Sequence, residues 1–196
     1  MVHILIPTYN RHSYLRSILT DITHQHYKDF DVRICSDGFD PIVLEMVQEF
    51  DRNNYQPYHY MHTLNFSNDW GLSPRKILID SVPLDKNYIS FIDDDDVICP
   101  EYLERLVEYC SQDIIPYCNI FLADEEINGE RIIPGREVNE FIYGYISAFC
   151  CLFPTELVKK CFYKWTARRD SDFDFVKECS LHKKLKYIPK ILAVAR

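Results

Sequence analysis

The sequence has no excess of basic residues. Its 196 residues include 22 Lys and Arg against 30 Asp and Glu, which gives a formal net charge of −8. Binding to a phosphate backbone requires a basic surface, so we expect no nucleic-acid partner. No apolar run approaches the roughly 20 residues of a membrane-spanning helix, and we expect no membrane span. The opening residues lack the length and charge pattern of a signal peptide.

Several ligand-binding motifs are also missing. Neither Gly-x-Gly-x-x-Gly nor the P-loop pattern occurs, so dinucleotide binding and P-loop chemistry have no support. The eight cysteines include no Cys-x-x-Cys pair, which argues against a zinc site. Most of them lie among apolar neighbours, as buried thiols of a reducing compartment do. We therefore expect a cytoplasmic protein rather than a disulfide framework.

The composition is that of a globular domain, with 47% apolar and 14% aromatic residues. Short apolar runs alternate with amphipathic patterns over the first 110 residues. This alternation predicts a doubly wound, largely parallel sheet flanked by helices. Strands are predicted at residues 3–7, 31–35, 58–61 and 88–92, and helices at 13–22, 41–50, from 73 onward and at 100–110.

The second half is predicted to be a smaller region of mixed strands. It contains no repeat, low-complexity tract or linker, so we expect one α/β domain over residues 1–196. Strands are predicted at residues 114–123, 131–133, 186–189 and 191–194, a turn at 125–129, and helices at 154–161 and 172–185.

The most informative stretch is the strand pattern at residues 88–92, which ends in Asp93, Asp94, Asp95 and Asp96. Four acids are not expected in a core, because burying an unpaired charge is costly. Ligands bind at the carboxyl ends of strands in such sheets, and strand alternation would let Asp93 and Asp95 converge. Paired carboxylates suit Mg²⁺ or Mn²⁺, with substrate phosphates completing the shell. The alternative is a solvated acidic turn before the helix at residue 100.

Arg75 falls in the first turn of the helix predicted from residue 73. The helix dipole disfavours a cation there, so this position indicates an anionic partner nearby. A solvated surface arginine is the alternative.

Short motifs lie at the ends of three of the predicted strands: Pro7-Thr8-Tyr9-Asn10-Arg11, Ser36-Asp37-Gly38, and Asp93-x-Asp95-Asp96 with Pro100 downstream. This arrangement resembles the family 2 glycosyltransferases of the A-type fold. The resemblance extends through Gly71-Leu72-Ser73-Pro74-Arg75, Ser171-Asp172-Phe173-Asp174 and the closing residues, so it covers nearly the whole chain. Ser36, Phe39 and Lys76 depart from the family's pattern.

The resemblance implies a site for a nucleoside-diphosphate sugar in residues 1–110 and an acceptor and catalytic half in residues 111–196. Tyr9 would stack on the base, Asp37 would accept a hydrogen bond from it, and Arg75 would approach the diphosphate. Asp95 and Asp93 would bind Mn²⁺ or Mg²⁺. The implied donor-binding set is Pro7, Thr8, Tyr9, Asn10, Asp37, Arg75, Asp93 and Asp94. An ordinary aromatic at Tyr9 and a plain Asp-Gly turn at Asp37 are the alternatives.

Family 2 members invert the anomeric centre and so need one general base. By motif, Asp172 is the candidate, and Asp170 and Asp174 are the alternatives. Acids that merely begin a helix would give the same pattern. Aromatic residues such as Trp70 and, in the second half, Trp165 could stack on sugar rings, although core packing is the better explanation for at least half of such residues.

The sequence thus predicts a metal-dependent, inverting glycosyltransferase that moves a sugar from a UDP-linked donor to a hydroxyl of a glycan or other acceptor. A non-catalytic module that binds nucleotide sugars or cations within a larger protein is the alternative. A sugar nucleotidyltransferase is less consistent, since it should show a Gly-rich loop after the first strand. Both a minimal enzyme and one module of a longer polypeptide fit the end of the chain.

Overall fold

The computed structural model describes residues 1–85, 87–124, 129–138, 141–142, 145–168 and 171–195. Its first sheet has the strand order β3-β2-β1-β4-β8, in which the first four strands are parallel and β8 is antiparallel to β4. The strands are β1 (Val2–Thr8), β2 (Phe30–Ser36), β3 (Tyr58–His62), β4 (Tyr88–Phe91) and β8 (Phe153–Pro154).

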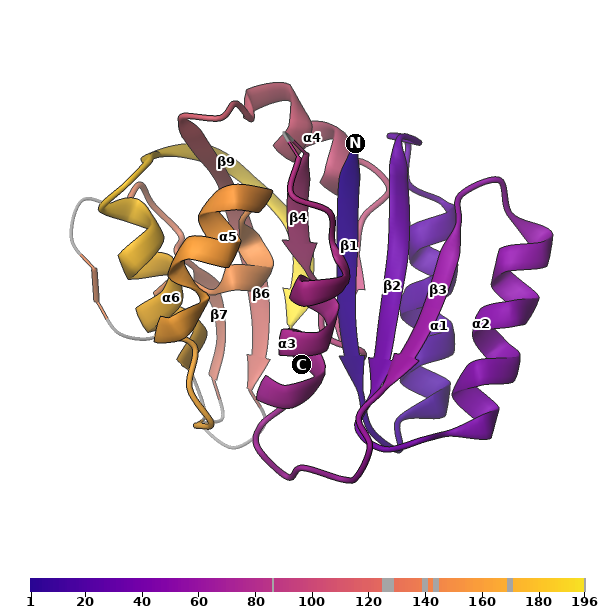
Figure 1. The fold of residues 1–196 in the computed structure, drawn as a ribbon. Coiled ribbons are helices and arrows are strands. Elements are labelled where there is room, and N and C mark those ends of the chain that lie inside the picture. Colours follow the sequence, from indigo (N-terminus) through magenta and orange to yellow (C-terminus); the bar gives the residue numbers. More distant parts are fainter. Residues whose placement is uncertain (86, 125–128, 139–140, 143–144, 169–170, 196) are drawn as a thin grey trace.

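Helices cover both faces of this sheet, which explains why β1 is buried along its whole length. Figure 1 shows α3 (Leu72–Ser81) in front of the sheet and α1 (His12–Thr23) behind it. α2 (Pro41–Asn53) begins at a proline, and the side chain of Asp40 caps its amide groups. The mostly parallel α/β architecture predicted from the sequence is confirmed.

The strand order places a crevice between the carboxyl ends of β1 and β4. The chain runs from β1 outward to β2 and β3, and then returns to the other side of β1 to form β4. Because the direction of winding reverses between β1 and β4, the loops at their carboxyl ends separate there. The acidic stretch after β4 therefore lies beside the loop after β1.

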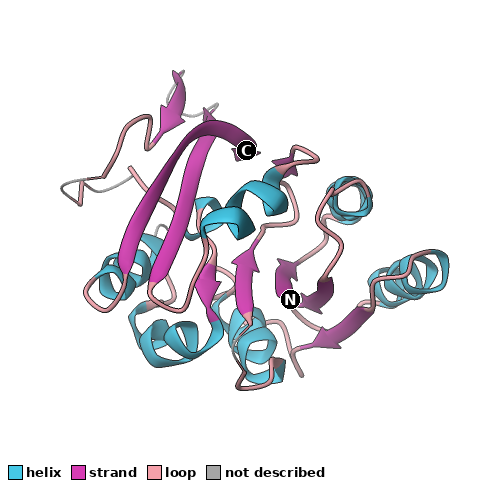
Figure 2. Cartoon of the chain, turned by 90° about the horizontal axis from the view of Figure 1, so that it is seen from above, coloured by secondary structure: helices cyan, strands magenta, loops and turns pink. Residues whose placement is uncertain are grey.

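The second sheet is mixed, as expected for the second half. Its order is β5-β9-β6-β7, in which β6 and β9 are parallel and the two outer pairings are antiparallel. Figure 2 shows the long strand that ends at the C-terminus curving alongside a second long strand. The strands are β5 (Val97–Ile98), β6 (Ile114–Asp124), β7 (Gly129–Ile133) and β9 (Lys184–Ala195).

Two predictions for the second half were wrong. The helix predicted to reach residue 185 is α6 (Ser171–Ser180), and the two predicted terminal strands are the single strand β9. Pro189 lies where the β6–β9 register shifts, so its missing N–H group does not interrupt the strand. The short strands β5 and β8 were not predicted, because two residues carry no readable periodicity. The predicted turn at 125–129 lies largely outside the described residues.

Four further segments complete the described part of the chain. These are the helices α4 (Tyr102–Tyr109) and α5 (Thr155–Cys161) and the 3₁₀ turns η1 (Ala148–Cys150) and η2 (Phe162–Lys164). Among the described helices, none combines the length and the apolar composition that a membrane crossing requires. All eight cysteines are free thiols.

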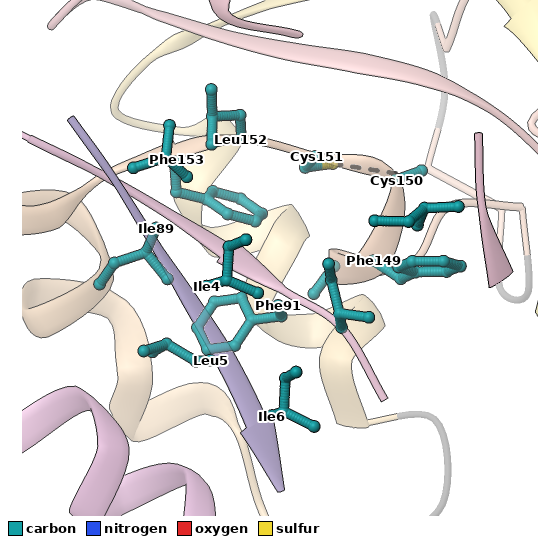
Figure 3. Packing of buried hydrophobic residues seen from close by; sticks show 14 of the residues in the cluster. Ile4, Leu5, Ile6, Ile89, Phe91, Phe149, Cys150, Cys151, Leu152 and Phe153 are labelled. Carbon is teal, nitrogen blue, oxygen red and sulfur yellow. Dashed lines mark hydrogen bonds between the residues drawn. The ribbon is translucent and has the colours of Figure 1, made fainter. Parts of the chain in front are cut away.

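An aromatic cluster of the core lies beneath the carboxyl end of β4. Figure 3 shows side chains of β1 and β4 packed against residues 149–153. Phe91, the last residue of β4, lies 5.0 Å from Trp165 and 5.8 Å from Phe175, measured between ring centroids. Trp165 is therefore a core residue rather than a platform for a sugar ring. This aromatic cluster gives the acidic stretch a rigid base.

A buried polar network crosses the sheet near the other end of β1. His3 and Asp31 are register partners, and His3 Nδ1 lies 2.8 Å from Asp31 Oδ1. Arg33 donates to the other carboxylate oxygen at 2.8 Å. Burial alone would raise the pKa of Asp31, but the hydrogen bonds from His3 and Arg33 outweigh it and hold this pKa below its usual value.

We expect Asp31→Asn to lower the free energy of unfolding by about 3 kcal/mol at pH 7, because Arg33 loses its counter-charge. The folded-state pKa of Asp31 is depressed, so the wild-type advantage is complete above about pH 4 and is lost as the pH falls through that lower pKa. Urea unfolding of both proteins from pH 7 downward measures this difference. Asp29→Asn, at an exposed carboxylate, is the control. A difference that does not shrink in acid would contradict the prediction.

Candidate functional site

A cavity of about 450 Å³ opens at the carboxyl ends of β1, β2 and β4. This volume lies within the range of small-ligand sites. Its lining includes most of the predicted donor-binding residues, whereas Asn10, Asp95 and Asp172 are not part of it. The lining residues are Pro7, Thr8, Tyr9, Arg11, Asp37, Phe66, Asn68, Asp69, Trp70, Gly71, Pro74, Arg75, Asp93 and Asp94.

An aromatic pair forms one wall of the cavity. Tyr9 stacks on Phe66 with ring centroids 4.3 Å apart and an angle of 16° between the ring planes. Both rings are about half exposed. Tyr9 was predicted to stack on a base, and here one of its faces stacks on a protein ring. Phe66 was not predicted, because nothing in its sequence context distinguishes it from a core residue.

Asp37 organises the loop that carries Phe66. Its carboxylate accepts hydrogen bonds from the hydroxyl of Thr63 at 2.9 Å and from the hydroxyl and amide of Ser67 at 2.8 and 3.0 Å. Ser67 also donates to Asp69, which in turn accepts from the first turn of α3. The predicted contact of Asp37 with a base stays a prediction. What the structure shows is a carboxylate that positions the loop over residues 63–69.

Three non-glycine residues have positive φ: Asn68 (50°) and Trp70 (58°) in the cavity lining, and Asn10 (53°) between the lining residues Tyr9 and Arg11. Asparagine adopts this conformation readily, but a residue as bulky as tryptophan rarely does. Such strained positions concentrate at functional sites. Trp70 is also exposed, so its indole is displayed at the mouth of the cavity.

The four consecutive aspartates form a turn rather than the end of a strand. β4 ends at Phe91, and the amide of Asp93 donates to Asp96 Oδ2 at 2.8 Å while the amide of Asp96 donates back to the Asp93 carbonyl. The strand alternation expected for Asp93 and Asp95 therefore does not apply. We refer to residues 93–96 as the acidic turn.

The expectation that none of these acids lies in a core was also wrong. Asp94 and Asp96 are only 3% and 6% exposed. Burial raises the pKa of Asp94, although hydrogen bonds from Thr8 and Arg11 oppose the shift. Burial and the charge of Asp93 raise the pKa of Asp96. Local hydrogen bonds thus make buried carboxylates tolerable, which sequence reasoning did not anticipate.

Two arginines neutralise the acidic turn. Arg75 is buried and pairs with Asp93, and its second terminal nitrogen donates to the Trp70 carbonyl at 3.0 Å. Its guanidinium lies 5.1 Å from the ring centre of Trp165. Arg11 donates to Asp94 at 3.0 Å and to Asp95 at 2.6 Å. Arg75 is therefore not the solvated arginine of the alternative interpretation. Arg11 had no predicted role, although it closes the motif after β1.

Asp172 lies at the start of α6, near Asp93 and Arg75. Its Oδ2 accepts hydrogen bonds from the Ser147 hydroxyl at 2.6 Å and the Ala148 amide at 3.0 Å. Burial raises the pKa of Asp172, these hydrogen bonds and Arg75 lower it, and the charge of Asp93 raises it further, so that the net shift is upward. Nothing in the sequence around Ser147 predicted its hydrogen bond to Asp172.

The other two candidate bases differ from Asp172. Asp174 is two residues further along α6, on the opposite face of the helix, and pairs with Arg168 at the surface. Asp170 lies outside the described residues.

The carboxylates suit a divalent cation only in part. No group of three or more His, Cys, Asp or Glu side chains in the described ranges is arranged to hold a metal. The side chains of Asp93 and Asp95 are 47% and 20% exposed, so both present hard oxygen donors that a cation can reach. Mg²⁺ and Mn²⁺ sites commonly use one or two carboxylates with substrate phosphates. The donor set fits a cation held jointly with a phosphorylated ligand.

Known proteins are similar to this chain in sequence. Residues 3–162 match the model of glycosyl transferase family 2. Glycosyltransferase GlyA of Streptococcus pneumoniae serotype 4 is 26% identical over 165 residues, which are 81% of this chain and 22% of that protein. Abequosyltransferase RfbV of Salmonella typhimurium is 30% identical over 139 residues, which are 69% of this chain and 39% of that protein. The chain thus spans well under half the length of either relative.

Solved structures resemble it over nearly the whole chain. The 1–349 segment of S. aureus TarS in complex with UDP gives a TM-score of 0.78 at 17% identity, covering 99% of this chain and 60% of that one. A mannosyltransferase, PcManGT from Pyrobaculum calidifontis, in complex with GDP-Man and Mn²⁺ gives 0.68 at 12% identity, covering 99% and 56%. At these identities the likeness concerns the fold. With the family match over most of its length, the chain belongs to glycosyl transferase family 2 and has that family's A-type fold.

Proposed function

We propose that this chain is the catalytic domain of an inverting, metal-dependent glycosyltransferase that uses a UDP-linked sugar and an acceptor hydroxyl. The observation that carries the proposal is that the Asp172 carboxylate lies within electrostatic range of Asp93 and Arg75, two residues that line the cavity and pair with each other. A candidate base and a candidate anion-binding arginine therefore influence each other. Support for the donor comes from the solved neighbours, which contain UDP, UDP-GlcNAc or GDP-Man, the last with Mn²⁺.

In this proposal the cavity binds the donor along its length. The Tyr9–Phe66 wall offers an aromatic face to the base. Arg75, fixed by the Trp70 carbonyl and by Trp165, presents its charge toward the diphosphate. Asp95 and Asp93 would hold the cation. A bound Mn²⁺ or Mg²⁺ neutralises charge that develops on the departing nucleoside diphosphate.

Asp172 is proposed as the base that takes the proton of the acceptor hydroxyl. Ser147 and Ala148 fix one carboxylate oxygen, and Oδ1 has no hydrogen-bond partner among the described residues. The raised pKa makes this carboxylate a better base than an ordinary aspartate, since basicity rises with pKa. The sugar carbon would be attacked on the face opposite the leaving diphosphate, so a single base suffices.

We expect thermal unfolding to identify the donor. A UDP-sugar with Mn²⁺ should raise the melting temperature, because a ligand that binds only the folded state stabilises it by mass action. Asp95→Ala should remove the Mn²⁺-dependent part of this increase, while shifting the ligand-free melting temperature by no more than about 2 °C. Asp113→Ala, which removes an exposed carboxylate paired with Lys183, is the control. A Mn²⁺-dependent shift that persists in Asp95→Ala would contradict the metal assignment.

A test of Asp172 distinguishes a catalytic domain from a module that only binds nucleotide sugars. Asp172→Asn should slow release of UDP from the UDP-sugar, with water as acceptor, by about 10²- to 10⁴-fold while donor binding persists. In the wild-type protein the rate should fall as the pH drops through the raised pKa of Asp172, since the protonated acid cannot accept a proton. Asp174→Asn, whose carboxylate pairs with Arg168, should retain the rate. Equal turnover of Asp172→Asn and wild type would exclude Asp172 as the base.

A substitution at Gly71 tests whether the position of Arg75 matters for UDP binding. It has φ of +75°, and a Cβ atom there would collide with the guanidinium of Arg75. We expect Gly71→Ala to cost about 1 kcal/mol of stability from backbone strain and to weaken UDP binding by displacing Arg75. Gly135→Ala, also at positive φ but outside the cavity lining, should cost stability without changing UDP binding. Calorimetric titration with UDP measures the difference, and equal affinities for both variants would contradict the assignment of Arg75.

A further inference from the structure

Arg11 contacts the acidic turn without being packed into the protein. It lies just before α1, and its side chain is 52% exposed. One terminal nitrogen, Nη1, donates both to Asp94 Oδ1 at 3.0 Å and to Asp95 Oδ2 at 2.6 Å. Because little packing holds the guanidinium, the two carboxylates determine where it lies.

The two contacts differ in how readily they can be given up. The Asp94 side chain is 4% exposed, and within the described part of the chain its other oxygen accepts a hydrogen bond only from the neutral Thr8 hydroxyl, at 2.7 Å. Without Arg11, this carboxylate would be buried with no counter-charge, which is strongly unfavourable. The Asp95 side chain is 20% exposed and can be solvated in part, so its ion pair with Arg11 is worth much less. Asp94 therefore anchors Arg11, and Asp95 can release it.

Building on the proposed function, we propose that Arg11 is the counter-ion of Asp95 in the ligand-free protein and that a divalent cation must displace it. A cation on Asp95 Oδ2 and a guanidinium 2.6 Å from the same oxygen would repel each other strongly. The guanidinium remains tethered to Asp94, at the lining of the cavity. From there it can contact an anionic diphosphate that arrives with the cation.

This arrangement couples the two ligands. A cation that binds alone has to break the Arg11–Asp95 pair without any replacement for it. When a diphosphate is also bound, the released guanidinium gains a new anionic partner, so each ligand increases the affinity for the other by the same factor. Asp94 is then a positioning residue for Arg11 rather than a direct contact to the donor.

The experiment measures Mn²⁺ binding to the whole chain by electron paramagnetic resonance of the free ion, with and without saturating UDP. In Arg11→Gln, Mn²⁺ alone should bind more tightly, by up to about five-fold, which is the scale of one partly exposed ion pair. UDP should bind Mn²⁺-loaded Arg11→Gln more weakly than Mn²⁺-loaded wild type. The factor by which UDP enhances Mn²⁺ affinity should therefore be smaller in the variant.

Arg16→Gln is the matched control. Arg16 lies on α1, which begins directly after Arg11, and pairs with Glu49 of α2, so its loss changes the net charge equally without touching the acidic turn. Arg16→Gln should show no increase in Mn²⁺ affinity. In Arg11→Gln the increase should persist in 0.5 M salt, where the Debye length is only about 4 Å. Circular dichroism confirms that both variants fold.

Failure of the Arg11 proposal and failure of the proposed function would give different results. If Mn²⁺ alone binds Arg11→Gln no more tightly than wild type, while UDP and Mn²⁺ still bind together, the counter-ion role of Arg11 is wrong and the proposed function stands. If no nucleotide binds either protein, the proposed function fails, and the affinities for Mn²⁺ alone still decide whether Arg11 competes for Asp95.

Discussion

The site depends on neutralising carboxylates at the carboxyl end of β4. Four acids follow one another there, and two of them are buried, so the acidic turn requires both counter-charges and hydrogen bonds. Arg11 comes from the segment after β1 and Arg75 from the first turn of α3. Pairing of these carboxylates with Arg11 and Arg75 therefore holds three separate segments of the chain together at one edge of the sheet. The cavity lies among these segments.

The two arginines are held in different ways. Arg75 is buried, bonded to the Trp70 carbonyl and stacked near Trp165, so its orientation follows from packing. Gly71 leaves room for it, since any side chain there would occupy the same space. Arg11 is held mainly by charge. A fixed arginine suits permanent recognition of an anion, whereas one held by carboxylates can change partners when other charges arrive.

The second half of the chain contributes the proposed base and a support for it. Asp172 lies in the first turn of α6, and the same helix packs Phe175 against Phe91, the last residue of β4. Packing of these rings sets how far Asp172 lies from the acidic turn. The 3₁₀ turn that begins after Ser147 then fixes one oxygen of Asp172. The second half thus brings the proposed base toward the mostly parallel sheet whose strand ends form the cavity.

Short apolar runs and amphipathic patterns in the sequence determined the first four strands and their helices, and the order of the motifs indicated the family, because both are local features of the sequence. The sequence also indicated that Tyr9, Asp37, Arg75 and the aspartates gather at one edge, since parallel strands end on the same side. Only the tertiary structure decided which carboxylates are buried, which arginine pairs with which acid, and that Phe66 covers Tyr9. Those contacts join segments tens of residues apart, and no local pattern encodes which side chains meet there.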